Sequence, residues 1–135
     1  MNTKELLKLL SEQFSGYVCH VSFLEELYSI LRKDLSGKEK QLFKQLAAQL
    51  ENIRKMGRMV YMADRNELLK GKGSRYYSIH LSSAQYNVRL LVYITGSGTP
   101  YFLSAFYERG GKSRTDYSSH IPVLDKRLEQ LLGGV

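Results

Sequence analysis

The sequence has a single cysteine and no long apolar run, and both features exclude classes of protein. Cys19 cannot form a disulfide within the chain, and its neighbours Val18 and Val21 favour a buried structural thiol over a nucleophile. No run approaches the roughly 18 apolar residues that a membrane helix needs. The N-terminal segment "MNTKELLKLLSEQF" contains acids where a signal peptide is apolar. We therefore expect a cytoplasmic protein from a reducing compartment.

The sequence also lacks the common patterns of metal, cofactor and phosphate sites. His20, His80 and His120 have no metal-like spacing with one another or with the cysteine. The glycines in "GKGS" (71–74) and "GSG" (96–98) lack the flanking strand and helix of a phosphate-binding loop. Paired carboxylates and a serine-triad pattern are also missing from the sequence. We expect no metal and no cofactor.

The chain is basic, and its charge is uneven. It has 135 residues, enough for one domain with one core, and a net charge of +7. Residues 1–69 contain 11 Lys and Arg against 9 Asp and Glu, whereas residues 70–135 contain 9 against 4, so the second half carries +5. This imbalance favours a polyanionic partner that binds mainly to the second half. Charge alone is also compatible with a soluble protein that binds no nucleic acid.

Hydrophobic periodicity predicts both helices and strands. Apolar residues at helical spacing follow capping signals at Asn2, Ser22 and Ser36, and Gly57 stands where a helix-ending glycine belongs. The predicted helices are at 3–14, at 23–33, between Ser36 and Gly57, and from near Pro122 to the Gly-Gly pair at 133–134. The predicted strands are at 17–22, 75–81, 87–94 and 101–108.

These elements predict an α+β fold. Only short turn-like segments separate the last three strands, so they form an antiparallel β-sheet meander. We expect this meander to pack against an α-hairpin from the first half of the chain, with a C-terminal helix and an extra N-terminal helix. Residues 1–16 are then an N-terminal helical extension, and 17–132 are the core of a single domain spanning 1–135. Residues 58–70 give a weaker signal: first a short strand or a continuation turn, and then a loop or one helical turn that closes on Gly71 and Gly73.

Alternation along the meander defines two faces and predicts one pairing in particular. If the hairpin between the first two meander strands is symmetric about its turn, His80 faces Arg89, with Cβ atoms about 5 Å apart. An unpaired guanidinium in a central strand is costly unless it meets water, an acid or a phosphate, so Arg89 favours a functional role. His80 by itself is also compatible with a polar surface residue.

The face that points away from the predicted α-hairpin combines cations with aromatic rings. Such a surface suits single-stranded nucleic acid, because cations follow the backbone while rings stack on bases at about 1–3 kcal/mol per base. Tyrosines at positions such as Tyr76 and Tyr93 more often pack than stack on bases, Tyr117 is also compatible with anchoring the last helix, and Lys112 with solvation. The residues assigned to nucleic-acid binding are Lys70, Lys72, Arg75, Tyr76, Tyr93, Arg109 and His120.

The order and spacing of these elements resemble the RelE/ParE superfamily of toxins from toxin–antitoxin systems. The resemblance covers about residues 17–132, and the predicted helix at 3–14 lies outside it. Four segments carry it, namely "HVSFLEELYSILRKDL", "LLKGKGSRYYSIHL", "YNVRLLVYI" and "FYERGGKSRTDYSSHIPVLDKRLEQL".

The resemblance implies a metal-independent, ribosome-dependent mRNA endonuclease that a cognate antitoxin holds inactive. In such an enzyme the 2′-hydroxyl of an mRNA nucleotide attacks the adjacent phosphodiester, and the protein orients the RNA, neutralises the developing charge and moves two protons. The resemblance assigns charge stabilisation to Arg89, stacking or proton transfer to Tyr117, and acid–base work to His80. It matches Lys112 and Arg114 to the cations of a basic loop.

Two other functions fit the same scaffold. ParE-like relatives inhibit DNA gyrase by binding it and cut no RNA, and a third alternative is a scaffold that only binds its partner. The side chains of His80, Arg89 and Tyr117 discriminate between these functions. Convergent side chains favour catalysis, whereas dispersed side chains favour binding.

Overall fold

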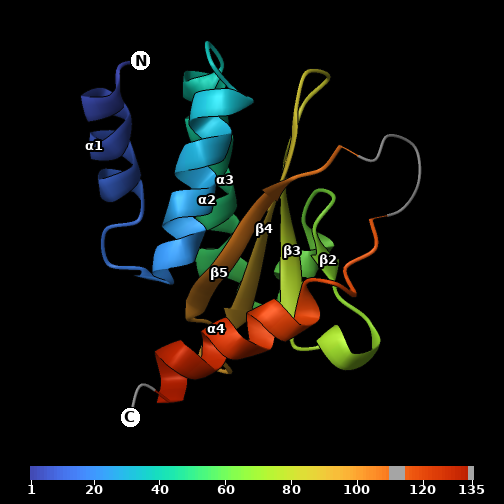
Figure 1. Ribbon diagram of the computed structural model, residues 1–135. Coiled ribbons are helices and arrows are strands. Elements are labelled where there is room, and N and C mark those ends of the chain that lie inside the picture. Colours follow the sequence, from blue (N-terminus) through green and yellow to red (C-terminus); the bar gives the residue numbers. More distant parts are fainter. Residues whose placement is uncertain (110–114, 134–135) are drawn as a thin grey trace.

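The computed structural model describes residues 1–109 and 115–133, which form an α+β fold as predicted (Figure 1). The helices are α1 (Thr3–Gln13), α2 (Val21–Lys33), α3 (Glu39–Met56) and α4 (Ile121–Gly133), with short 3-10 helices η1 (Gly57–Met62) and η2 (Gly71–Gly73). The strands are β1 (Val18–Cys19), β2 (Glu67–Leu68), β3 (Tyr76–Ser82), β4 (Asn87–Ile94) and β5 (Pro100–Tyr107).

The strands of the described residues form one sheet in the order β1-β5-β4-β3-β2. β3, β4 and β5 pair antiparallel, which confirms the predicted meander, and β2 adds a short antiparallel edge. β1 instead pairs parallel to β5, through Val18 with Tyr101 and Cys19 with Phe102. The sheet is therefore mixed, because α2 and α3 carry the chain away from β1 before it returns in the same direction.

The predicted strand at 17–22 is too long, because α2 begins earlier than the capping pattern indicated. His20 is the N-cap of α2, and its Nδ1 accepts a hydrogen bond from the backbone N–H of Ser22 at 3.0 Å. Ser22 is thus inside the first turn of the helix. The prediction that Ser36 caps the next helix is also wrong, since the N-cap of α3 is Lys38, which makes no side-chain capping bond.

Two other helix boundaries are confirmed. The side-chain oxygen of Asn2 accepts a hydrogen bond from the backbone N–H of Glu5 at 2.8 Å at the start of α1. Gly57 ends α3 with φ of 53°, in the left-handed region that a glycine reaches without a steric penalty.

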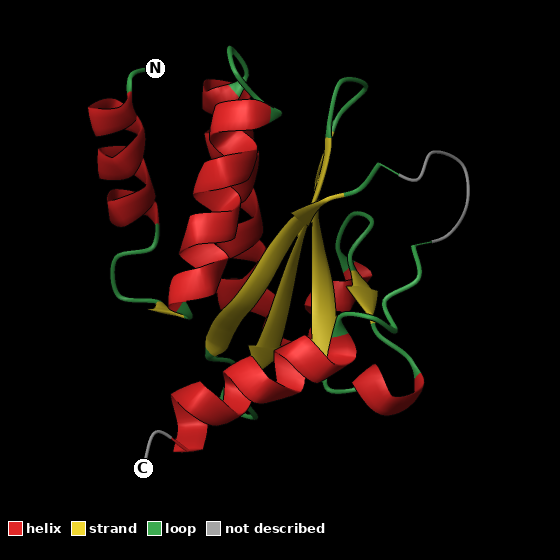
Figure 2. Cartoon of the chain, in the orientation of Figure 1, coloured by secondary structure: helices red, strands yellow, loops and turns green. Residues whose placement is uncertain are grey.

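The sheet separates two apolar cores, and Figure 2 shows helices on both of its sides. α1, α2 and α3 lie on one side of it, and α4 crosses the other side. The larger core, beneath the first three helices, includes Leu27, Leu46, Ile79, Leu90 and Val92. The smaller core, beneath α4, includes Tyr76, Leu91, Leu103, Leu124 and Leu128. None of the helices in the described ranges is long and apolar enough to cross a membrane.

The N-terminal helix belongs to the larger core. Leu6 of α1 is fully buried, and the ring of Phe14 lies 5.2 Å from that of Phe102 on β5. The nearby Cys19 also packs against this core, and burial raises the pKa of its thiol to about 12. A thiol that stays protonated at neutral pH is a poor nucleophile, as expected for a structural cysteine.

Side chains cover the edge of β3 where β2 has ended. Gln45 donates to the carbonyl of Ser82 at 2.8 Å, and Gln49 donates to the carbonyl of His80 at 3.0 Å. The backbone N–H of His80 donates to Asn66 Oδ1 at 2.9 Å. These bonds satisfy buried backbone groups in place of a strand, so they fix the position of His80.

An ion pair between α2 and α4 fixes the opposite edge of the sheet. The two terminal nitrogens of Arg127 donate to the Glu26 carboxylate at 2.8 and 3.1 Å. Glu26 also accepts a hydrogen bond from the backbone N–H of Ala105 at 3.1 Å. Its carboxylate thus bonds to the part of β5 that lies beyond the short strand β1. This contact holds α4 across the sheet and thereby positions the residues that precede it.

Candidate functional site

The site is built on a row of paired residues on the sheet face that α4 crosses. His80 on β3 is paired with Arg89 on β4, and Arg89 is paired with Phe106 on β5. The predicted pairing of His80 with Arg89 is thus confirmed. Paired residues point to the same face of a sheet, so these three side chains lie in one row.

Tyr117, from the segment that leads into α4, brings a hydroxyl group to this row. The hydroxyl lies 2.7 Å from Glu67 Oε2 and 2.9 Å from Ser78 Oγ. The same oxygen of Glu67 lies 2.9 Å from His80 Nε2. We refer to Glu67, Ser78, His80, Arg89 and Tyr117 as the polar cluster.

Glu67 determines where the protons of the polar cluster lie, because an ionised carboxylate only accepts hydrogen bonds. His80 donates to Glu67 from Nε2, which leaves its Nδ1 as an acceptor. The single proton of the Tyr117 hydroxyl is donated to Glu67 Oε2 or to Ser78 Oγ, which both lie within hydrogen-bond distance. The cluster therefore combines a basic ring nitrogen with a phenol that carries its proton.

Burial shifts the pKa values of both titratable partners of Glu67. It lowers the pKa of His80, and the charge of Arg89 lowers this pKa further, against the opposing effect of the hydrogen bond that His80 donates to Glu67. Burial raises the pKa of Tyr117, although its hydrogen bond with Ser78 lowers this pKa. Both groups are neutral near pH 7, so His80 can accept a proton and Tyr117 can donate one.

Arg89 has no acidic partner within the described part of the chain. One terminal nitrogen donates to the side chain of Asn87, while the buried Nε has no hydrogen-bond partner in residues 1–109 and 115–133. A partly buried guanidinium without an anion is unfavourable. The cluster therefore has an unmet capacity to bind negative charge.

Aromatic rings flank the polar cluster. The ring of His120 stacks on Phe106, with centroids 4.3 Å apart and planes 22° apart. The Tyr117 ring meets Phe106 nearly edge-on, at 6.3 Å and 75°. Burial lowers the pKa of His120, against the charges of Glu26 and Glu108, so the stacked ring is neutral near pH 7.

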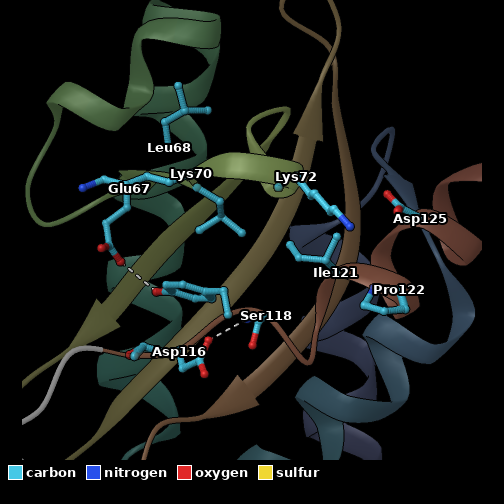
Figure 3. Close-up of a pocket in the computed structure, with 13 residues that line it drawn as sticks. Glu67, Leu68, Lys70, Lys72, Asp116, Ser118, Ile121, Pro122 and Asp125 are labelled. Carbon is cyan, nitrogen blue, oxygen red and sulfur yellow. Dashed lines mark hydrogen bonds between the residues drawn. The ribbon is translucent and has the colours of Figure 1, made fainter.

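A cavity of about 780 Å³ opens beside the polar cluster, between β2, η2 and the start of α4 (Figure 3). Glu67 and Tyr117 line it together with Lys70 and Lys72. Figure 3 shows Lys72 extending over Ile121, on the side of the cavity that α4 forms. We refer to this space as the Lys72 cavity. It brings both predicted nucleic-acid-binding lysines next to the cluster.

Two other predicted residues are held at the first turns of α4. Tyr76 is fully buried, and its hydroxyl donates to Asp125, so its ring offers no face to a base. Arg75 forms an ion pair with the same carboxylate at 2.9 Å, and its guanidinium lies 5.1 Å from the centre of the Tyr76 ring. Tyr76 therefore packs within the fold, which is the alternative to stacking on a base.

Tyr93 and Arg109 are also engaged within the fold. Tyr93 packs against the smaller core and meets the ring of Tyr101 edge-on at 6.1 Å. Arg109 pairs with Asp34 at the end of α2, away from the polar cluster. Lys112 and Arg114, predicted as catalytic loop cations, lie outside the described residues.

Glu67 and Ser78 are the site residues that sequence reasoning missed. Glu67 lies in a stretch read as a loop, because β2 has only two residues and shows no alternation. Ser78 is fully buried on β3 and reads as an ordinary strand residue. The position of Ser78, two residues before His80 and on the same face, was the one available signal.

Comparisons with other proteins do not assign the chain to a group. Neither a scan against protein-family models nor searches of curated proteins and of solved structures gave a match. Across residues 1–109 and 115–133, no group of three or more His, Cys, Asp or Glu is arranged to hold a metal ion. The polar cluster and the charge around it therefore carry the functional argument.

Proposed function

We propose that this protein is an endoribonuclease of the RelE type, the toxin of a toxin–antitoxin pair, which cuts mRNA on the ribosome. The observation that carries the proposal is that His80 and Tyr117 both hydrogen-bond to Glu67, while Arg89 is paired with His80 across the sheet. An unpaired cation beside one proton acceptor and one proton donor is what cleavage of a phosphodiester requires.

The reaction is a transfer of the phosphoryl group within the RNA. The 2′-oxygen forms a bond to phosphorus as the bond to the 5′-oxygen breaks, which leaves a cyclic phosphate and a free 5′-hydroxyl. His80 takes the 2′-hydroxyl proton at Nδ1, and the Tyr117 phenol gives its proton to the leaving oxygen. Arg89 neutralises the charge that develops on the phosphorane.

Glu67 has a positioning role in this scheme. Its Oε2 accepts from both His80 and Tyr117, so it sets the tautomer of the imidazole and the position of the phenol. A carboxylate this close to the reacting phosphate also repels it, and that repulsion makes the unpaired charge of Arg89 more important.

The arrangement of the elements supports the RelE type of scaffold. A three-strand antiparallel meander has two consecutive helices on one face and a C-terminal helix on the other. The excess of positive charge in residues 70–135 supports an anionic substrate and an antitoxin that shields it. A ribosome-bound substrate implies that the protein acts in the cytoplasm.

The test is primer extension on mRNA from cells that briefly express the protein. We expect new 5′ ends in register with the reading frame, and we expect them to vanish with Arg89→Ala. Arg54→Ala is the matched control, because this arginine pairs with Glu51 on the exposed surface of α3. Growth arrest with intact message would instead support a ParE-like gyrase inhibitor. If expression caused neither growth arrest nor message cleavage, the toxin proposal would be refuted.

A further inference from the structure

A second cavity, also about 780 Å³, opens where α3 meets the edge of β3. Its lining includes Arg65, His80, Ser82 and Ser83, and we refer to it as the Arg65 cavity. His80 belongs to both this cavity and the polar cluster, just as Glu67 and Tyr117 belong to both the cluster and the Lys72 cavity. The polar cluster therefore contributes residues to the walls of two cavities.

The lining of the Lys72 cavity contains two lysines and three carboxylates. Its three carboxylates, from Glu67, Asp116 and Asp125, each accept a hydrogen bond from a donor of this chain. Lys70 and Lys72 are exposed and form no ion pair with a described residue. Either lysine can therefore meet an anionic group without breaking an ion pair within the described residues.

The lining of the Arg65 cavity likewise contains both an arginine and a carboxylate, from Asp64. Arg65 is exposed and forms no ion pair in the part of the chain that the structure describes, yet it lies close enough to His80 that its charge helps to lower the pKa of that ring. The neighbouring Asp64 carboxylate faces the amide of Asn52 at 3.5 Å. The hydroxyls of Ser82 and Ser83 add neutral donors to this wall.

We propose that a single RNA strand crosses the edge of the sheet from the Lys72 cavity, over the polar cluster, to the Arg65 cavity. This inference rests on the proposed function and adds the path of the substrate. Lys72, Arg89 and Arg65 each meet one phosphate along the strand. Cations distributed along a path match a repeating negative charge, whereas one small anion would engage only one of them.

The path also favours an unpaired strand over a duplex. Bases of a single strand are free to turn into the two cavities, whereas bases held in pairs are not. The Lys72 cavity offers such a base an apolar wall from Leu69, Ile121 and Pro122. A Cβ on Gly73 would lie 2.6 Å from Ile121 Cδ1, so the absence of a side chain there lets η2 close against this wall.

The test measures binding apart from cleavage. The probe is a fluorescently labelled 2′-O-methyl RNA of about eight nucleotides, which has no 2′-hydroxyl nucleophile. Anisotropy is recorded for the full chain over a range of salt concentrations. We expect Arg65→Ala and Lys72→Ala each to weaken binding about three- to tenfold and to reduce the slope of log affinity against log salt by about 1. The control Arg54→Ala leaves affinity and slope unchanged.

The outcomes separate this inference from the proposed function. If only one variant changes the slope, or neither does, the strand does not span both cavities and the inference is overturned. Reduced slopes in both variants, together with intact message in expressing cells, would support the path and refute the nuclease. Cleavage that depends on Arg89, with unchanged slopes, would support the nuclease and refute the path.

Discussion

The Tyr117 hydroxyl lies 2.7 Å from Oε2 of Glu67, a residue fifty positions earlier in the chain. This hydrogen bond joins the segment before α4 to the edge strand β2, and it places a phenol beside His80. Because Glu67 also accepts from His80, one carboxylate connects three segments of the fold. Its contacts suggest variants that separate stability from function.

Replacing Arg89 with methionine separates the effect on stability from the effect on RNA cleavage. The methionine keeps much of the side-chain volume and removes a partly buried charge that has no anion, so we expect the free energy of unfolding to rise by about 1 kcal/mol. Message cleavage should be lost in the same variant. Urea unfolding and primer extension measure the two effects, with Arg54→Met as the exposed control. A destabilised variant, or one that still cleaves, would contradict the role given to Arg89.

His80 should make stability fall in mildly acidic solution. Burial and the charge of Arg89 lower its folded-state pKa below the value of 6.5 for the unfolded chain. The unfolded state therefore binds more protons between these two pKa values, so this share of stability is present above about pH 6.5 and is lost as the pH falls through the folded pKa.

The measurement is urea unfolding of the wild-type protein and of His80→Gln at several pH values between about 7.5 and 5. We expect the wild-type protein to lose more stability over this range. His120→Gln should also reduce the loss of stability at low pH, independently of His80, because burial lowers the pKa of His120 as well. Identical pH profiles for the wild-type protein and His80→Gln would argue against a buried neutral imidazole.

Tyr117→Phe removes one hydroxyl and keeps the ring against Phe106. The variant loses the hydrogen bonds to Glu67 and Ser78, so we expect a loss of about 1–2 kcal/mol in the free energy of unfolding. Cleavage should fall by about a hundredfold, because the proton donor is absent. Tyr107→Phe is the control, since among the described residues that hydroxyl makes only a long contact of 3.5 Å with the carbonyl of Gln85. If Tyr117→Phe cleaved RNA as fast as the wild-type protein, Tyr117 would not be the proton donor, and its role would be structural.

Asn66→Ala tests the side chains that cover the edge of β3. Asn66 is buried, accepts from the backbone N–H of His80 and exchanges hydrogen bonds with Gln49. Its removal leaves several buried groups without partners, so we expect a loss of about 2–4 kcal/mol. Hydrogen exchange at the His80 amide should become faster. Asn52→Ala, at the exposed end of the same network, should cost well under half as much, and equal losses would disprove this account.

Much of the fold was predictable because the signals are local. The meander, its hairpin register and the N-cap at Asn2 follow from alternation, turn spacing and residue type within short windows. The capping patterns at Ser22 and Ser36 failed because the pattern does not determine which residue becomes the cap. At the start of α2 the imidazole of His20 takes that place, and its Nε2 is held by Gln130 of α4 at 2.6 Å.

The candidate site was predictable only in part. The pairing of His80 with Arg89 is a matter of register, and register follows from the length of the turn. Glu67 lies on a strand of two residues, which has too few positions to show a period. Tyr76 matched the expected aromatic character of the face, yet α4 covers it, and the periodicity of β3 cannot reveal what packs on its surface.

The sequence by itself determined the α+β class, the meander and the side on which Arg89 points, because each depends on contacts between near neighbours. Only the tertiary structure decided that Glu67, His80 and Tyr117 meet, that Arg109 is held by Asp34, and that two cavities flank the polar cluster. These contacts join segments that are distant in the chain. Their geometry is set by how α4 and the ends of the sheet pack together, and no short stretch of residues contains that information.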